Sequence, residues 1–177
     1  MKNLKTVGMA VFAVAAVSAA AMFFGQGKSS EAAAVLPGTI TPAPGWELQN
    51  TDGQTIHSSD FKGKVVILDF WATWCPPCKA EIPGFIALQN EYGKKGLAVV
   101  GISVDEGGAA VVKQFAQQSG MNYPVLLADE KTPRAFGGIE AIPTTFIIDR
   151  EGRIVTKHLG FTEKDEFEKE LKPLLNP

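Results

Sequence analysis

The sequence predicts an α/β protein whose mixed central sheet is covered by helices on both faces. Two apolar runs of strand length, 65–71 and 97–104, contain hardly any polar residues, as expected of strands that are buried on both faces. A segment with helical character follows each run, and this alternation favours parallel neighbours in the middle of the sheet. A last pair of strands and a terminal helix complete the predicted fold.

Local signals set the limits of the predicted elements. Asp52-Gly53 is typical of a hairpin turn, and Pro76 suits the first turn of a helix. Thr162 is expected to cap the terminal helix, with Asp165 completing a capping box. In chain order we expect strands 46–49, 55–57 and 65–71, helix 76–92 with a kink or break near Pro83, strand 97–104, helix 109–118, strand 123–128, a helical turn at 133–136, strands 144–149 and 154–159, and a helix from 162 to 175.

Composition indicates a folded protein with one core. The chain has 177 residues, of which 45% are hydrophobic and 20% are charged, so a disordered chain is excluded. The formal net charge of −2 gives no electrostatic reason to expect a nucleic acid partner.

The N-terminal segment predicts export from the cytoplasm. Lys2 and Lys5 precede an uncharged run, residues 7–24, which is either a cleaved signal peptide or an anchor just long enough to span a bilayer. Residues 25–44 are rich in Gly, Ser, Ala, Thr and Pro and are expected to form a flexible linker. The predicted organisation is therefore a leader or membrane anchor (1–24), a linker (25–44) and one domain (45–177), located outside the cytoplasm and either anchored or secreted.

Cys75 and Cys78 are the chain's two cysteines, and both belong to one Cys-x-x-C motif. A strand that leads to such a turn, followed at once by a helix, is typical of a dithiol redox site with a Cys75–Cys78 disulfide in its oxidised form. A structural zinc site needs about four ligands, and His57 and His158 are neither paired nor close to the cysteines in sequence. We therefore expect no metal and no cofactor.

The predicted helix start explains how Cys75 would become reactive. If Cys75 is the N-cap, its sulfur lies at the positive end of the helix dipole, which favours the thiolate. Pro76 and Pro77 occupy the first two helical positions, and Pro77 has no amide hydrogen to donate. Mainly the amide of Cys78 remains as a donor, so we expect a moderate lowering of the Cys75 pKa and a reducing couple.

Two carboxylates are candidates for moving the proton of Cys78. Asp69 interrupts a buried strand, so its pKa should be raised, and it is six residues before Cys75. It is either the base that activates Cys78 or a satisfied structural carboxylate. Glu81, one helical turn after Cys78, either shares this role or is an ordinary first-turn acid.

Other residues near the motif are candidates for binding the substrate. Pro143 opens a predicted strand; it is either unremarkable there or a cis proline in a tight turn that leaves the backbone of Ile142 free to pair with a substrate. Trp74, just before Cys75, would form an apolar lip, or it belongs to the core, while Trp71 packs beneath. With Pro76 and Pro77, these residues form the predicted substrate surface, whereas His57 and His158 have no predicted catalytic role.

The chain resembles the thioredoxin superfamily, and specifically its TlpA/ResA-like branch of exported proteins. The resemblance covers about residues 46–175. Two features narrow the resemblance to this branch. One is the segment CKAEIP, in which Glu81 matches an active-site Glu of the branch, and the other is the extra helix and strand at about 107–129. The matching residues are Asp69, Trp71, Trp74, Cys75, Pro77, Cys78, Pro83 and Ile142-Pro143-Thr144.

The resemblance implies a thioredoxin-like fold, with an N-terminal hairpin and a central helix–strand insert, and an extracytoplasmic thiol-disulfide oxidoreductase. It implies that the enzyme reduces disulfides of exported proteins, among them apocytochrome c, and receives electrons from a membrane thiol transporter. Three alternatives remain: a disulfide-forming oxidant that uses the same site, a copper-binding assembly factor that uses the cysteines with His158, and a thiol peroxidase. The peroxidase pattern P-x-x-x-T-x-x-C requires Pro and Thr where this chain has Leu68 and Ala72.

Overall fold

The computed structural model describes residues 41–176, which belong to one compact unit of the chain, residues 31–177. The predicted leader, 1–24, and most of the predicted linker, 25–44, lie outside the described residues. Between residues 41 and 176, no helix is both long enough and apolar enough to cross a bilayer.

The fold is built on a mixed six-stranded sheet with the strand order β1-β8-β7-β4-β5-β6. β4 pairs with β5, and β5 with β6, in parallel, whereas β4–β7, β7–β8 and β8–β1 are antiparallel. The predicted mixed sheet is thus confirmed. Its strands are β1 (Thr41–Pro42), β4 (Val65–Trp71), β5 (Leu97–Ser103), β6 (Val125–Leu127), β7 (Thr144–Ile148) and β8 (Arg153–Leu159).

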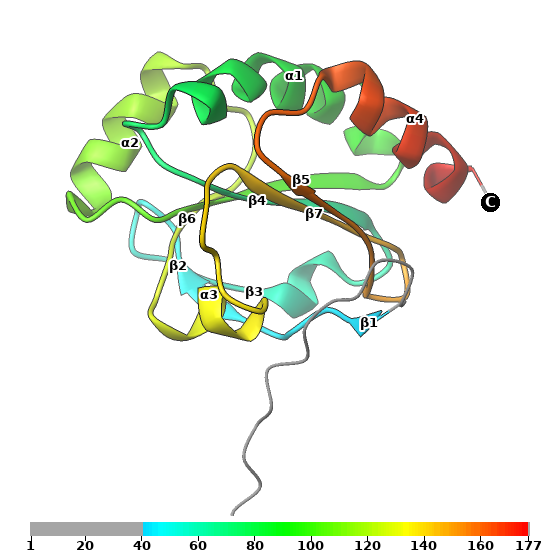
Figure 1. Ribbon diagram of the computed structural model, residues 1–177, viewed down its shortest axis with the longest axis horizontal. Coiled ribbons are helices and arrows are strands. Elements are labelled where there is room, and N and C mark those ends of the chain that lie inside the picture. Colours follow the sequence, from blue (N-terminus) through cyan, green and yellow to red (C-terminus); the bar gives the residue numbers. More distant parts are fainter. Residues whose placement is uncertain (1–40, 177) are drawn as a thin grey trace, which may run out of the picture. The chain divides into compact units, whose positions relative to one another are not determined.

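Helices cover both faces of this sheet (Figure 1). Three helices, α1, α2 and α4, lie on one face, and the short α3 lies on the other with the hairpin of β2 and β3. Their bounds are α1 (Pro76–Tyr92), α2 (Gly108–Gln118), α3 (Lys131–Ala135), α4 (Lys164–Leu175), β2 (Glu47–Gln49) and β3 (Thr55–His57), with 3-10 turns η1 (Ser58–Phe61) and η2 (Gly93–Lys95).

β4 and β5 show why the apolar runs predicted central strands. Every residue of both strands is buried, because successive side chains point into two different cores. In β4, Ile67 and Trp71 belong to the core beneath α1 and α4, whereas Leu68 and Phe70 belong to the core on the α3 side. Asp69 points to the same face as Ile67 and Trp71, and it is the one charged residue of this strand.

α1 begins where the sequence predicts, with Cys75 as its N-cap and prolines at its first two positions. The helix is continuous through Pro83, so the predicted interruption does not occur. α2 and α3 match the predicted helices within two residues. α3 begins at Lys131 because the Asp129 carboxylate accepts hydrogen bonds from the amides of Lys131 and Thr132.

Two predictions at element ends were wrong. Thr41 and Pro42, assigned to the linker, pair with Ile154 and Arg153 as the edge strand β1, which is too short to show any periodicity. The N-cap of α4 is Glu163 and not Thr162, and no side chain caps the helix. The amide of Thr162 instead donates to the carboxylate of Glu81 on α1, a tertiary contact that local sequence patterns do not contain.

Candidate active site

The two cysteines form a disulfide at the N-terminus of α1, directly beyond the carboxyl end of β4. Cys75 and Cys78 are joined by an S–S bond of 2.02 Å, and their Cα atoms are 5.3 Å apart. Both residues are buried in this oxidised form, with Cys75 3% exposed. The strand and the helix therefore hold the two sulfurs at a fixed place on the rim of the sheet.

The amide of Cys78 donates to the sulfur of Cys75, with an N···Sγ distance of 3.2 Å. Pro76 and Pro77 occupy the first two helical positions, so neither provides an N–H there. In the reduced protein this single donor and the helix dipole would stabilise a Cys75 thiolate. The moderate lowering of the Cys75 pKa stays a prediction for the reduced protein.

A carboxylate that the sequence analysis missed holds the loop before Cys75 in place. Asp105 accepts hydrogen bonds from the amide of Thr73 at 2.9 Å and from the hydroxyl of Ser103 at 2.8 Å. The Thr73 hydroxyl also donates to Asp105. The carboxyl ends of parallel β4 and β5 meet at one edge of the sheet. The position of Asp105 just after β5 could therefore have indicated that it lies close to the loop after β4.

Ile142 and Pro143 pass beside the disulfide. The Ile142–Pro143 peptide bond is cis, and the carbonyl oxygen of Ile142 is 3.7 Å from Sγ of Cys75. The carbonyl oxygen of Pro143 accepts a hydrogen bond from the amide of Gly160, at 2.8 Å, which brings the end of β8 to the same place. The structure thus brings together the Cys75 turn, the Ile142-Pro143 segment and Gly160, which are far apart in the sequence.

Asp69 is buried in β4, six residues before Cys75, and lacks a cationic partner among the described residues. The hydroxyl of Thr145, opposite it on β7, donates to Oδ1 at 3.0 Å. Burial raises the pKa of Asp69 to about 7, and the Thr145 hydrogen bond opposes this rise only in part. The carboxyl group therefore exchanges its proton near neutral pH, as a general base requires.

Glu81 is a second buried acid of the same region. Its Oε1 accepts the amide of Thr162 at 2.7 Å, whereas Oε2 is buried and has no hydrogen-bond partner in the described part of the chain. Burial first, and then repulsion by Asp69, raise the pKa of Glu81 to about 8. Tyr123 is a third buried ionisable residue near these two acids. Burial first, and then the charges of Asp69 and Glu81, raise its pKa. Sequence reasoning missed Tyr123.

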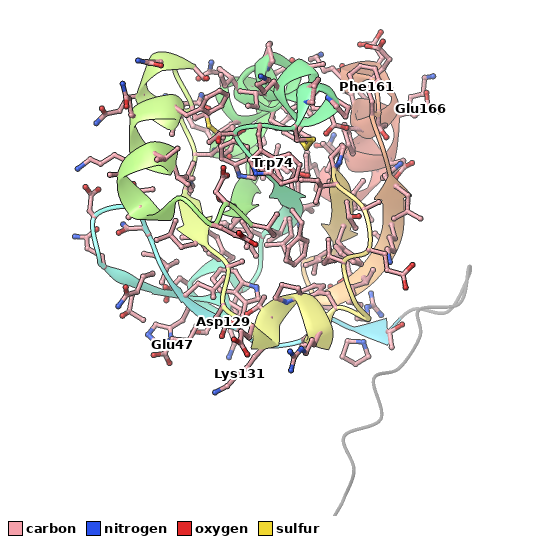
Figure 2. The ribbon with its side chains drawn as sticks, turned by 60° about the vertical axis from the view of Figure 1, so that its left-hand side comes forward. Glu47, Trp74, Asp129, Lys131, Phe161 and Glu166 are labelled. Carbon is pink, nitrogen blue, oxygen red and sulfur yellow. A yellow bond between two sulfur atoms is a disulfide. The ribbon has the colours of Figure 1, made fainter. Side chains whose placement is uncertain are left out.

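Exposed apolar side chains surround the disulfide. Trp74 is 64% exposed, so it is a surface residue and not part of the core, whereas Trp71 is buried as expected. Leu159 and Phe161, which are 68% and 46% exposed, flank the Gly160 amide that binds Pro143. Figure 2 shows Trp74 near the middle of the view and Phe161 above it to the right. The sequence analysis missed Leu159, the last residue of β8, and Phe161, which lies just after it, because neither belongs to a motif.

His158 lies opposite Thr145 on the neighbouring strand, two strands from Asp69, and His57 lies in the β2–β3 hairpin. His158 Nε2 is 3.2 Å from Oε2 of Glu170, and its ring packs against Phe167. His57 is an exposed residue beside Glu47. Over residues 41–176, no three His, Cys, Asp or Glu side chains are grouped so that they could hold a metal ion.

Comparison with known proteins gives a consistent result. A model of the AhpC/TSA family matches residues 40–157. A thiol-disulfide oxidoreductase ResA of Bacillus thuringiensis is 36% identical over 134 residues, which cover 75% of this chain and 76% of the relative. The thioredoxin-like protein YneN of Bacillus subtilis is 39% identical over 131 residues, 73% and 76% of the two chains. The crystal structure of a thiol:disulfide interchange protein of the thioredoxin family from Chlorobium tepidum matches with a TM-score of 0.72 and 38% identity, over 78% of this chain and 98% of that one.

These similarities confirm the resemblance to the thioredoxin superfamily and the thioredoxin-like fold. They extend over the part of the chain that contains the Cys-x-x-C turn, the buried acids and the cis proline. The chain belongs to the AhpC/TSA family, and within it to the ResA-like thiol-disulfide oxidoreductases.

Proposed function

We propose that this enzyme works outside the cytoplasm and reduces disulfides of exported proteins. One observation carries the proposal: the Cys75–Cys78 pair caps α1 with a single amide donor, and the strand and helix that flank it, β4 and α1, carry two buried acids whose pKa values are raised to about 7 and 8. A modestly stabilised thiolate with a proton acceptor nearby suits a reductant better than an oxidant.

The proposed reaction has two exchange steps. The Cys75 thiolate attacks one sulfur of a substrate disulfide, forms a mixed disulfide and releases the other substrate sulfur as a thiolate, which takes a proton from solvent. Cys78 then passes its thiol proton to the carboxyl pair, with Asp69 as the base, and attacks the sulfur of Cys75. The second substrate thiol leaves, two electrons have passed to the substrate, and the Cys75–Cys78 disulfide has formed.

The location and the partners are further parts of this proposal. The apolar segment 7–24, after Lys2 and Lys5, supports export, either with cleavage or as an anchor. A disulfide product must be reduced again by an external dithiol, and a membrane thiol transporter would provide it. Apocytochrome c is a candidate substrate through the family resemblance, and any exported protein with an accessible disulfide fits the chemistry.

The reduction potential tests the proposed direction of electron flow. We expect equilibration with dithiothreitol to give a value toward the thioredoxin end of the range from about −270 mV to about −120 mV that such motifs span. The physical reason is the loss of the Pro77 amide as a donor to the Cys75 thiolate. A value above about −150 mV would instead support the disulfide-forming oxidant.

The exposed apolar residues lead to a prediction about substrate size. Changing Trp74 and Phe161 to alanine should raise the KM for a protein disulfide about tenfold, because apolar contact area is lost. The rate with a small aromatic disulfide should stay within about twofold, since that substrate meets only the sulfurs. Val155→Ala is the control, because it removes an exposed apolar side chain near the beginning of β8, at the other end of the strand from Leu159. Equal losses with both substrates would mean that Trp74 and Phe161 support the site and do not bind proteins.

A further inference from the structure

The charges of the described domain are divided between the two edges of the sheet. At the edge with the disulfide, exposed acids follow β5, precede the cis proline and precede α4: Glu106, Glu140 and Glu163. One exposed cation, Lys79, stands near the sulfurs in sequence. Glu166, in the first turn of α4, lies near Phe161 in Figure 2 and is paired with Lys169 at 3.6 Å. We call this edge the cysteine end.

The opposite edge is basic. Exposed lysines precede β4 and β5 at their amino ends, and an arginine follows β7, which runs antiparallel to β4. This set forms what we call the basic end: Lys62, Lys64, Lys94, Lys95 and Arg150. Within residues 41–176 none of the five forms an ion pair, although Lys95 lies 4.7 Å above the ring of Tyr92.

Arg150 fixes the shape of this surface. Its guanidinium donates to the carbonyl oxygens of Gly63, Lys95 and Leu175, so it joins the segments before β4 and β5 to the end of α4. Carbonyl oxygens satisfy its hydrogen bonds and leave its positive charge uncompensated. The basic end is therefore built on a rigid frame.

Acidic residues at this edge offset part of this charge. Asp149 and Glu151 share Arg153, at 2.7 and 3.0 Å, so these three residues keep one net negative charge. Asp60 and the exposed Glu91, three residues before Lys94, add one negative charge each. The five cations of the basic end still outnumber the negative charges around them.

The chain also enters the domain at the basic end. Thr41 and Pro42 pair with Ile154 and Arg153, next to the turn that contains Arg150. Residues 25–40 separate this point from the apolar segment 7–24 in the sequence. A cavity of about 410 Å³ opens beside the same strand, with Trp46 and Phe61 in its lining and Lys62, Lys64 and Arg150 around it.

We propose that the basic end contacts a bilayer surface that carries anionic headgroups. The inference rests on the anchored form of the function proposed above. The cations of the basic end attract anionic lipids over about 8 Å at physiological salt. The acidic cysteine end is repelled by the same surface, so in this bound orientation the disulfide faces soluble substrates. The domain has to leave the orientation to be reduced again by the membrane thiol transporter proposed above.

Lysine footprinting of the full-length chain in nanodiscs tests this orientation. Discs of phosphatidylcholine alone are compared with discs containing equal parts of phosphatidylcholine and phosphatidylglycerol, and acetylation is followed by mass spectrometry. In the anionic discs Lys62, Lys64, Lys94 and Lys95 should react about fivefold more slowly, and high salt should remove the protection. Lys79 and Lys131, on other surfaces, should react alike in both. Equal rates at all six lysines, or stronger protection of Lys79, would overturn the proposal.

A pair of charge-reversed variants separates this proposal from the enzymatic one. Lys62→Glu with Lys64→Glu and Lys94→Glu should abolish the protection at the remaining Lys95 while leaving protein-disulfide reduction unchanged. The control, Lys131→Glu with Lys157→Glu and Lys169→Glu, changes the same charge elsewhere and should keep the protection. If the wild-type chain fails to remain with the discs, the anchored form is wrong and the inference falls with it, whereas reductase activity in solution still tests the proposed function alone.

Discussion

Replacing Cys75 by serine is expected to abolish reduction of insulin disulfides, and replacing Cys78 by serine is expected to trap a mixed disulfide. A serine hydroxyl does not ionise at neutral pH, so the first variant has no nucleophile to attack the substrate. The second variant can attack but cannot resolve the complex, because the thiol one turn along α1 is gone. Mass spectrometry of the products should show the covalent adduct for the second variant and none for the first.

Alkylation of the reduced protein provides the control for this pair. The N-cap position predicts that Cys75 reacts with iodoacetamide at neutral pH faster than Cys78. The test is demanding, because Cys75 is only 3% exposed in the oxidised form. An inert Cys75, or normal turnover by Cys78→Ser, would exclude the two-step mechanism.

Changing Asp69 to asparagine should stabilise the oxidised protein at alkaline pH. The pKa of Asp69 is about 7 in the folded state, against 3.8 as its ordinary value. Between these values the folded state holds a proton that the unfolded state has lost, so the wild-type free energy of unfolding falls as the pH rises. A shift of about three units corresponds to roughly 4 kcal/mol as an upper limit, and we expect a gain of about 2–4 kcal/mol at pH 8.

The asparagine keeps the shape of the carboxylate and can still accept the Thr145 hydroxyl. At pH 4 both side chains are neutral, so the two proteins should unfold at nearly the same denaturant concentration. Denaturant titrations at both pH values measure the difference, with the exposed Glu106→Gln as the control. A gain of equal size at pH 4 and pH 8 would show that burial of charge is not the cause.

The same substitution should slow the second exchange step more than the first at neutral pH. Asparagine cannot accept the proton of Cys78, whereas attack by Cys75 requires no base once the thiolate has formed. Stopped-flow measurements can follow formation and decay of the mixed disulfide separately. Equal slowing of both steps would argue against Asp69 as the proton acceptor.

The parts of this fold that follow from local chemistry were predictable. β4 and β5 are continuous apolar runs because both faces are covered, and the position of Cys75 follows from the prolines that begin α1. The redox pair needed no tertiary information, because both sulfurs belong to one turn. Asp69 was recognisable as a charge within a buried strand.

What the sequence could not reveal depends on contacts between distant segments. β1 is two residues long and is held only by pairing with β8. Asp105 holds Thr73 across 32 positions of the chain, and Glu81 binds the amide of Thr162 across 81. Such partners are chosen by the topology of the sheet and not by local spacing, so Leu159 and Phe161 were also missed.

The hydrogen bond from the Thr162 amide to Glu81 connects a buried acid of the site with the exposed apolar residues Leu159 and Phe161. An ionised carboxylate holds that amide more tightly than a neutral acid does, so the charge on Glu81 and the seating of residues 159–162 favour each other. By reciprocity, a polypeptide that presses on Leu159 and Phe161 changes how readily Glu81 takes up a proton. Binding of a substrate protein would thereby change the acidity of Glu81, on the helix whose first turn carries the two sulfurs that exchange with that substrate.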